Sequence, residues 1–148
     1  MINDIGNFNN RYWDLSCMLE SSNKRDIERT IELIRKIGGK KVRFITLYGS
    51  MTVRKYTNLS DIDIAVFYEG DKDERFKFRM KILGRVKDDF DVRTFQDLPV
   101  YIRKEIISHG KMIYFREYDR IFDIFMHTIR EFEDFKPRLD MYYSSLEA

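Results

Sequence analysis

Two aspartates, Asp61 and Asp63, stand at the start of the apolar run IDIAVF with a single isoleucine between them. Along a β-strand, side chains at positions i and i+2 project from the same face about 7 Å apart. The spacing therefore predicts that both carboxylates point together while Ile62 and Ile64 point into the opposite layer. Two ionised groups about 4 Å apart repel by roughly 4 kcal/mol at an effective dielectric of about 20, so the pair needs a cation, a shared proton or basic partners.

A third carboxylate, Asp91, begins the run DVRTF, which is expected to form a strand beside the one that carries Asp63. Three converging carboxylates favour a hard divalent cation, magnesium or manganese. Two such ions about 4 Å apart can activate an attacking hydroxyl and stabilise a leaving oxygen in phosphoryl or nucleotidyl transfer. Arg93, two residues after Asp91 on the same predicted face, could instead neutralise that carboxylate, and the two interpretations are compatible.

Gly49 and Ser50 follow the apolar run that precedes the aspartates. Glycine allows a sharp turn and a close approach of the backbone to a ligand, and Ser50 could open a helix whose N–H groups and hydroxyl hold a triphosphate. A phosphate-binding turn opposite a metal-binding strand defines a nucleotide site. Basic residues flank this segment and are either solvated surface or a positive rim for triphosphate: Lys40, Lys41, Arg43, Arg54 and Lys55.

The periodicity of apolar residues predicts an α/β (α+β) domain in which a small mixed β-sheet is flanked by helices. We expect helices at about 25–37, 72–87, 99–108 and 117–135, strands at about 42–49, 62–67, 90–95 and 111–115, and a short last helix after a break at Pro137. Residues 1–148 are read as one domain, with a core at about 25–116 and a helical tail at about 117–148. The apolar faces assigned to the second helix and the tail are Phe76, Met80, Leu83 and Val86, and Tyr118, Ile121, Phe122, Phe125, Ile129 and Phe132.

The composition restricts the class of protein. The 148 residues are 43% hydrophobic and 35% charged, with no uninterrupted apolar stretch of the length that a membrane helix needs, so we expect a cytoplasmic protein without membrane contact. A net charge of +2 gives no reason to expect direct nucleic-acid binding. One cysteine, Cys17, and two histidines, His109 and His127, do not favour a disulfide or a zinc site.

Gly49-Ser50, ten further residues and then Asp61-Ile62-Asp63 resemble the GS-x10-DxD signature of the DNA polymerase beta nucleotidyltransferase superfamily. The run from Ser60 to Ile64 matches its common SDIDI form, and the resemblance spans about 41–116. It implies the nucleotidyltransferase fold, with Asp61 and Asp63 as ligands of both metal ions. Asp91 would bind the ion that holds the nucleophile and help to deprotonate it.

The resemblance also implies that Gly49, Ser50 and Ser60 bind the nucleotide. One departure is Arg54, where many relatives have a further glycine; its longer side chain could crowd the nucleotide or add a phosphate contact.

In length and in its EFEDFKPRLDMYY ending, the chain is similar to the minimal nucleotidyltransferases, many of which are antitoxins encoded beside HEPN-domain ribonuclease toxins. The resemblance implies transfer of AMP from ATP to a hydroxyl, on a tyrosine of such a toxin, with two Mg²⁺ ions or Mn²⁺. Two alternatives remain: an antitoxin that neutralises its partner by binding with weak or lost catalysis, and an enzyme that modifies a small molecule such as an aminoglycoside. The aromatic stripe of the tail suits a core, a homo-oligomer or a partner protein.

Overall fold

The computed structural model describes residues 21–49 and 62–147. The predictions for Ser50, Arg54, Ser60 and Asp61 lie outside these residues. The elements in chain order are α2 (Ser21–Gly38), η2 (Gly39–Lys41), β1 (Val42–Tyr48), β2 (Ile62–Tyr68), α3 (Lys72–Leu83), β3 (Phe90–Thr94), η4 (Phe95–Asp97), α4 (Val100–His109), β4 (Lys111–Phe115) and α5 (Tyr118–Glu147). Across the described part of the chain, no helix has the length and apolar character needed to cross a membrane.

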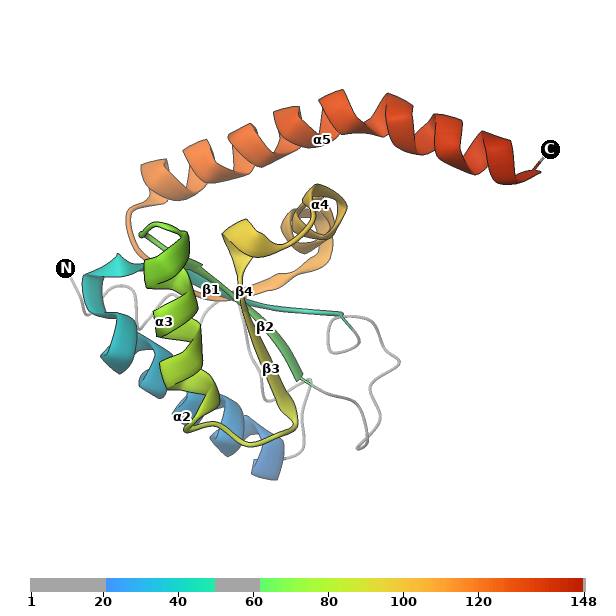
Figure 1. Cartoon of the computed structure of the whole chain (residues 1–148). Coiled ribbons are helices and arrows are strands. Elements are labelled where there is room, and N and C mark those ends of the chain that lie inside the picture. Colours follow the sequence, from blue (N-terminus) through green and yellow to red (C-terminus); the bar gives the residue numbers. More distant parts are fainter. Residues whose placement is uncertain (1–20, 50–61, 148) are drawn as a thin grey trace.

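The four strands form one mixed sheet in the order β3-β2-β1-β4 (Figure 1). β1 pairs antiparallel with both β2 and β4, and β2 pairs parallel with β3. The parallel pair is joined by α3, which returns the chain to the edge of the sheet as a crossover connection requires. The predicted mixed sheet flanked by helices is confirmed.

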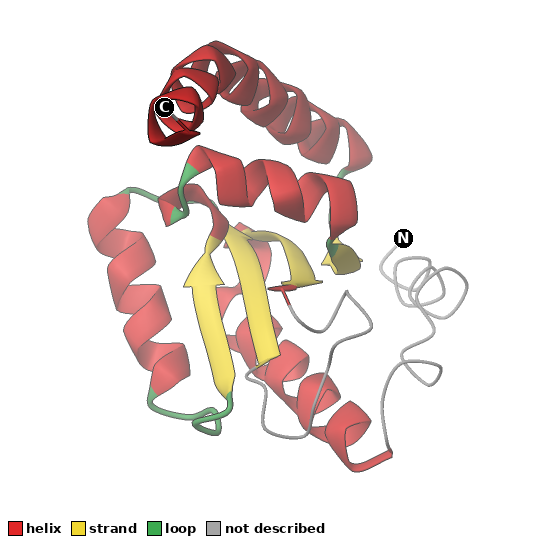
Figure 2. Cartoon of the chain, turned by 90° about the vertical axis from the view of Figure 1, so that its right-hand side faces the viewer, coloured by secondary structure: helices red, strands yellow, loops and turns green. Residues whose placement is uncertain are grey.

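Helices cover both faces of the sheet (Figure 2). On one face, α2 and α3 enclose a core that includes Ile34, Ile64 and Ile82. On the other, α4 and α5 pack over Phe44, whose ring meets Phe95 and Phe125 edge to face. Because both faces are covered, β1 and β2 are apolar on both sides over most of their length, and Asp63 is a polar interruption in that pattern.

The predicted apolar face of the second helix is wrong at Phe76 and Met80, although Val86, beyond the end of α3, packs against the core as expected. Phe76 and Met80 are 61% and 42% exposed, whereas Phe78 and Ile82 are buried. Both sets recur at helical spacing, and packing decides between them: the ring of Phe78 stacks on Tyr68 at a centroid distance of 4.1 Å. The helix also ends at Leu83, earlier than expected, where Gly84 provides the C-cap.

The predicted break at Pro137 is also wrong, because α5 is one continuous helix with Pro137 in its interior. Proline removes one N–H bond and its ring crowds the preceding turn, which bends or breaks a helix. Pro137 is exposed, so the carbonyl that loses its donor can bind water, and α5 is visibly bowed along its length (Figure 1). Its buried stripe is Ile121, Ile124 and Thr128, while Tyr118 and Phe122, which the sequence placed on that stripe, are exposed.

Candidate active site

Three polar side chains lie in one row across adjacent strands. Tyr48 at the end of β1 faces Asp63 near the start of β2, and Asp63 faces Asp91 near the start of β3. Neighbouring strands are about 4.8 Å apart, so side chains at facing positions of the same face are direct neighbours. The prediction that the strand of Asp91 lies beside that of Asp63 is confirmed by this register; the chemical roles of the two residues remain predictions.

The starts of β2 and β3 are held together by backbone contacts. Ile62 donates its N–H to the carbonyl of Asp89 at 2.8 Å, which ties the first residue of β2 to the turn before β3. On the outer side of β3, Arg79 of α3 donates Nε–H to the carbonyl of Val92 at 3.0 Å. Ile62 and Val92 are themselves buried. These contacts fix the register that brings Asp63 beside Asp91.

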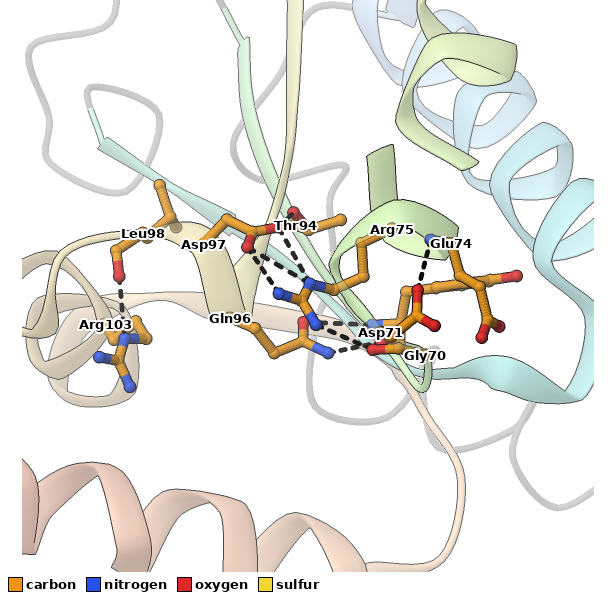
Figure 3. A network of polar contacts seen from close by, with 10 residues as sticks. Gly70, Asp71, Glu74, Arg75, Thr94, Gln96, Asp97, Leu98 and Arg103 are labelled. Carbon is orange, nitrogen blue, oxygen red and sulfur yellow. Dashed lines mark hydrogen bonds and ion pairs between the residues drawn. The ribbon is translucent and has the colours of Figure 1, made fainter. Parts of the chain in front are cut away.

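The opposite ends of β2 and β3 are fixed by Arg75 (Figure 3). Its guanidinium donates to both carboxylate oxygens of Asp97, with Nη2 at 2.9 Å from Oδ1 and Nε at 3.1 Å from Oδ2, and Nη1 donates to the carbonyl of Gly70 at 2.8 Å. Gln96 bridges to the backbone N–H and carbonyl of Tyr68. The loop after β2 and the turn after β3 are therefore joined, and the two strands are anchored at both ends.

Gly49 directly follows β1 and has a left-handed backbone with φ of +73°. A Cβ added there would collide with Oδ2 of Asp63. Glycine was predicted to permit close approach of the backbone to a ligand. In the structure the close approach is to the Asp63 carboxylate, which Gly49 holds against the turn.

Arg93 lies beside Asp91, with Nε 3.1 Å from Oδ2 and 3.3 Å from Oδ1. The neutralising partner considered from the sequence is therefore present. The side chain of Arg93 is 52% exposed and that of Asp91 is 34% exposed, so the pair is screened by water and contributes little stability. A cation that binds the carboxylate more tightly can displace Arg93, whose guanidinium then remains in solvent.

The hydroxyl of Tyr48 is affected by both carboxylates. Burial is the largest cause of the raised pKa of Tyr48, and the negative charges of Asp63 and Asp91 act in the same direction while Arg93 and Arg79 oppose them; together they bring this pKa to about 12. Tyr48 is thus a neutral hydroxyl at physiological pH. Tyr48 was not among the site residues predicted from the sequence, although its position directly before Gly49 and its place on the same face of β1 as Phe44 were available signals.

The donor set fits a divalent cation. Asp63 and Asp91 present carboxylate oxygens, the ligands that Mg²⁺ and Mn²⁺ prefer, from facing positions where their like charges repel. Within residues 21–49 and 62–147, no group of three His, Cys, Asp or Glu side chains is placed to hold a metal ion. The third expected ligand, Asp61, lies outside those ranges.

Two of the basic residues suggested as a triphosphate rim are engaged elsewhere. Lys41 pairs with Glu74 at 2.6 Å, and Arg43 pairs with Glu69 and Glu117, each at 3.3 Å. Both precede or begin β1, at the end of the strand away from Gly49. Their positive charge serves local ion pairs, which favours the alternative that these two residues belong to the solvated surface.

A mixed sheet with paired aspartates at the starts of adjacent strands, following a glycine turn, defines the nucleotidyltransferase class of fold. Residues 28–119, more than half of the chain, match the family described as polymerase beta, nucleotidyltransferase. The chain therefore belongs to the polymerase beta nucleotidyltransferase family.

Similar proteins agree with this assignment. A Methanocaldococcus jannaschii protein named as a candidate protein adenylyltransferase is 39% identical over 74 residues, which are 50% of this chain and 57% of that protein. The match thus spans little more than half of the relative's length. A chain of a toxin–antitoxin crystal structure with AMP-PNP superimposes with a TM-score of 0.65 at 20% identity, covering 82% of this chain and 98% of that chain.

A second similar structure is that of a tri-AMPylated Shewanella oneidensis HEPN toxin in complex with an MNT antitoxin. The match has a TM-score of 0.62 at 20% identity and covers 84% of this chain and 98% of that chain. At this identity the likeness to both structures establishes the fold.

Proposed function

We propose that this protein is a metal-dependent adenylyltransferase that transfers AMP from ATP to a tyrosine hydroxyl of a HEPN-domain partner and thereby acts as its antitoxin. The observation that carries the proposal is the facing pair Asp63 and Asp91 beside the Gly49 turn. The relatives support the acceptor class, since one is named for protein adenylylation and another structure contains an AMPylated HEPN toxin.

In the proposed reaction the acceptor oxygen attacks the α-phosphorus of ATP, and the bond to the bridging oxygen of the β-phosphate breaks. AMP is joined to the acceptor and pyrophosphate leaves. Asp91 accepts the hydroxyl proton and releases it to water, and Asp63 orients the reacting phosphate. Bound divalent ions would supply Lewis-acid stabilisation of the charge on the phosphate oxygens, with Asp61, Asp63 and Asp91 as their ligands.

The nucleotide-binding roles are assigned to Gly49, Ser50 and Ser60. Gly49 has the positive φ and the tight contact that keep the turn next to Asp63. Tyr48, a neutral hydroxyl in the same row, is suited to donate a hydrogen bond to a phosphate or carboxylate oxygen. We assign it a positioning role.

The proposal is tested by incubating the full chain with α-labelled ATP, Mg²⁺ or Mn²⁺, and a candidate HEPN-domain partner. We expect label on the partner, a mass increase of one AMP per modified site, and localisation to tyrosine by peptide mass spectrometry. Omission of metal and the Asp63→Asn variant are the controls. Label found only on added aminoglycosides would instead support a small-molecule enzyme.

The second candidate is an antitoxin that acts by binding alone. It is favoured by the distal half of α5, where four large apolar side chains are more than half exposed: Met141, Tyr142, Tyr143 and Leu146. A stable complex that inhibits the partner without any transfer of label, with Asp63→Asn inhibiting as well as the unaltered protein, would establish this candidate and overturn the first.

A further inference from the structure

A hollow of about 400 Å³ lies on the outer edge of the sheet, between α3 and the segment that follows β3. It is lined by Lys72, Arg75, Phe76, Arg79, Arg93, Thr94, Asp97 and Leu98, a set that we call the β3-edge hollow. All of these residues belong to the described part of the chain. The hollow is separate from the row of Tyr48, Asp63 and Asp91 but adjoins it through Arg93, which contacts Asp91.

The β3-edge hollow has an excess of positive charge. Four of its side chains are cationic and one, Asp97, is anionic. Asp97 neutralises Arg75, and Arg93 contacts Asp91. Neither Lys72 nor Arg79 forms an ion pair with any residue in the described ranges. Two cations of the hollow therefore remain available to an incoming anionic group.

The hollow also has an exposed aromatic side chain. Phe76 is 61% exposed although it lies on a helix whose other face is well packed. Beside it, the outward carbonyl of Val92 is already occupied by Nε of Arg79. Because Arg79 occupies the carbonyl of Val92, a ligand cannot pair with β3 as an added strand at that residue. A ligand on this edge is therefore recognised by side chains.

The hollow lies close to Asp91, the residue proposed to accept the proton of the acceptor hydroxyl. Arg93 is two residues after Asp91 on the same face of β3, which corresponds to about 7 Å. Consider an extended peptide that runs along β3 with its acceptor hydroxyl at Asp91. Its residues two to four positions from that hydroxyl then lie about 7 to 13 Å from Asp91. Those residues would lie over Arg93, Arg79 and Lys72.

We infer that the β3-edge hollow binds an acidic segment of the protein acceptor. Lys72 and Arg79 contact an Asp or Glu that lies two to four residues from the modified hydroxyl, and Phe76 contacts an apolar residue of the same segment. The inference rests on the proposed function. A peptide fits better than a nucleic acid, because the cations are few, are gathered in one small hollow and belong to a chain of net charge +2.

The test uses two fluorescent tyrosine peptides that differ only in their flanking residues, Glu in one and Gln in the other. Binding to the full chain is measured by anisotropy without ATP, so that the readout does not depend on catalysis. We expect the Glu peptide to bind at least tenfold more tightly at low salt and to lose this advantage in Lys72→Glu and in Phe76→Ser. Lys77→Glu, an exposed charge reversal on the same helix outside the hollow, should leave binding unchanged.

Transfer of AMP to the same peptides provides the second readout. The acidic peptide should have at least a fivefold lower KM at similar kcat, and Lys72→Glu should raise its KM to that of the Gln peptide. Equal binding of both peptides, or equal losses in Lys72→Glu and Lys77→Glu, would overturn the inference, as would tighter binding of a single-stranded oligonucleotide at the same residues. Selective binding without any transfer would uphold the hollow and refute the proposed function.

Discussion

The carboxylate of Asp63 lies against the backbone of Gly49, in the space that a side chain at position 49 would occupy. Gly49 also has a φ of +73°, a conformation that residues with a Cβ adopt at a cost of about 1 kcal/mol or more. A Cβ added at position 49 would therefore have two effects, since it would strain the turn and displace the carboxylate of Asp63. Glycine at this position therefore keeps the turn closed on Asp63.

Gly49→Ala should accordingly reduce both stability and activity. We expect the free energy of unfolding in urea to fall by about 2 kcal/mol or more, since strain and a steric clash combine, and AMP transfer to fall at least tenfold. The matched control is Gly39→Ala, because Gly39 also has a positive φ of +56° but nothing within 4 Å of the added Cβ. That variant should lose about 1 kcal/mol and keep its activity; equal effects of the two variants would show that the contact with Asp63 is irrelevant.

Removal of either facing carboxylate should abolish transfer without unfolding the protein. Asp63→Asn and Asp91→Asn each delete one charge of the facing pair, and the half-exposed contact of Arg93 with Asp91 contributes little stability, so the free energy of unfolding should change by less than about 1 kcal/mol. Transfer should fall about 1,000-fold, equivalent to about 4 kcal/mol of transition-state stabilisation. Calorimetry should show weakened Mn²⁺ binding. Asp88→Asn, an exposed carboxylate before β3, serves as the control. Full activity of Asp63→Asn would contradict the mechanism.

The sheet, and the neighbouring positions of Asp63 and Asp91 in the candidate site, could be predicted because they follow from the pattern of apolar residues. The amphipathic helix between two apolar strands predicted that β3 lies beside β2, and the parallel pairing found in the structure brings Asp91 to Asp63. A sharp turn at Gly49 was predicted from its place after an apolar strand, and its positive φ agrees with such a turn.

The contacts that could not be predicted depend on tertiary packing. In α3, apolar residues occur on two faces, and only the stacking of Phe78 on Tyr68 decides which face is buried. Pro137 lies within α5, where the helix bends but continues, so the expectation that proline ends the helix did not hold. The role of Tyr48 required the tertiary structure, since its elevated pKa depends first on its burial and then on the charges of Asp63 and Asp91 from two other strands.

The elevated pKa of Tyr48, about 12, makes stability fall at alkaline pH. Because the folded-state pKa lies above the unfolded value of 10.0, the neutral phenol contributes stability that is fully present below pH 10 and is lost as the pH rises towards 12. Tyr48→Phe should therefore show a shallower decline in urea stability between pH 9 and pH 11. Tyr118→Phe, which alters a side chain that is 70% exposed, should follow the unaltered protein. Identical pH profiles for all three proteins would show that Tyr48 ionises normally.

The ion pair of Arg75 with Asp97 should affect stability mainly at neutral pH. Hydrogen bonds from Arg75 lower the pKa of Asp97, so the carboxylate contributes stability that is present above its ordinary pKa of 3.8 and is lost as the pH falls through the lower folded value. The Asp97 side chain is 42% exposed, and water screening limits the expected loss in Asp97→Asn to about 1 kcal/mol at pH 7. The deficit should shrink towards pH 3.

Asp140→Asn is the matched control for this pair, because Asp140 is exposed and forms no ion pair with a described residue. A double-mutant cycle with Arg75→Met separates the pairwise energy from the loss of each side chain. ATP binding should be unchanged in Asp97→Asn, since Asp97 follows the end of β3 and Asp91 lies near its start. A large loss of ATP binding at unchanged stability would mean that the Arg75 network positions the nucleotide site directly and does more than anchor the far ends of β2 and β3.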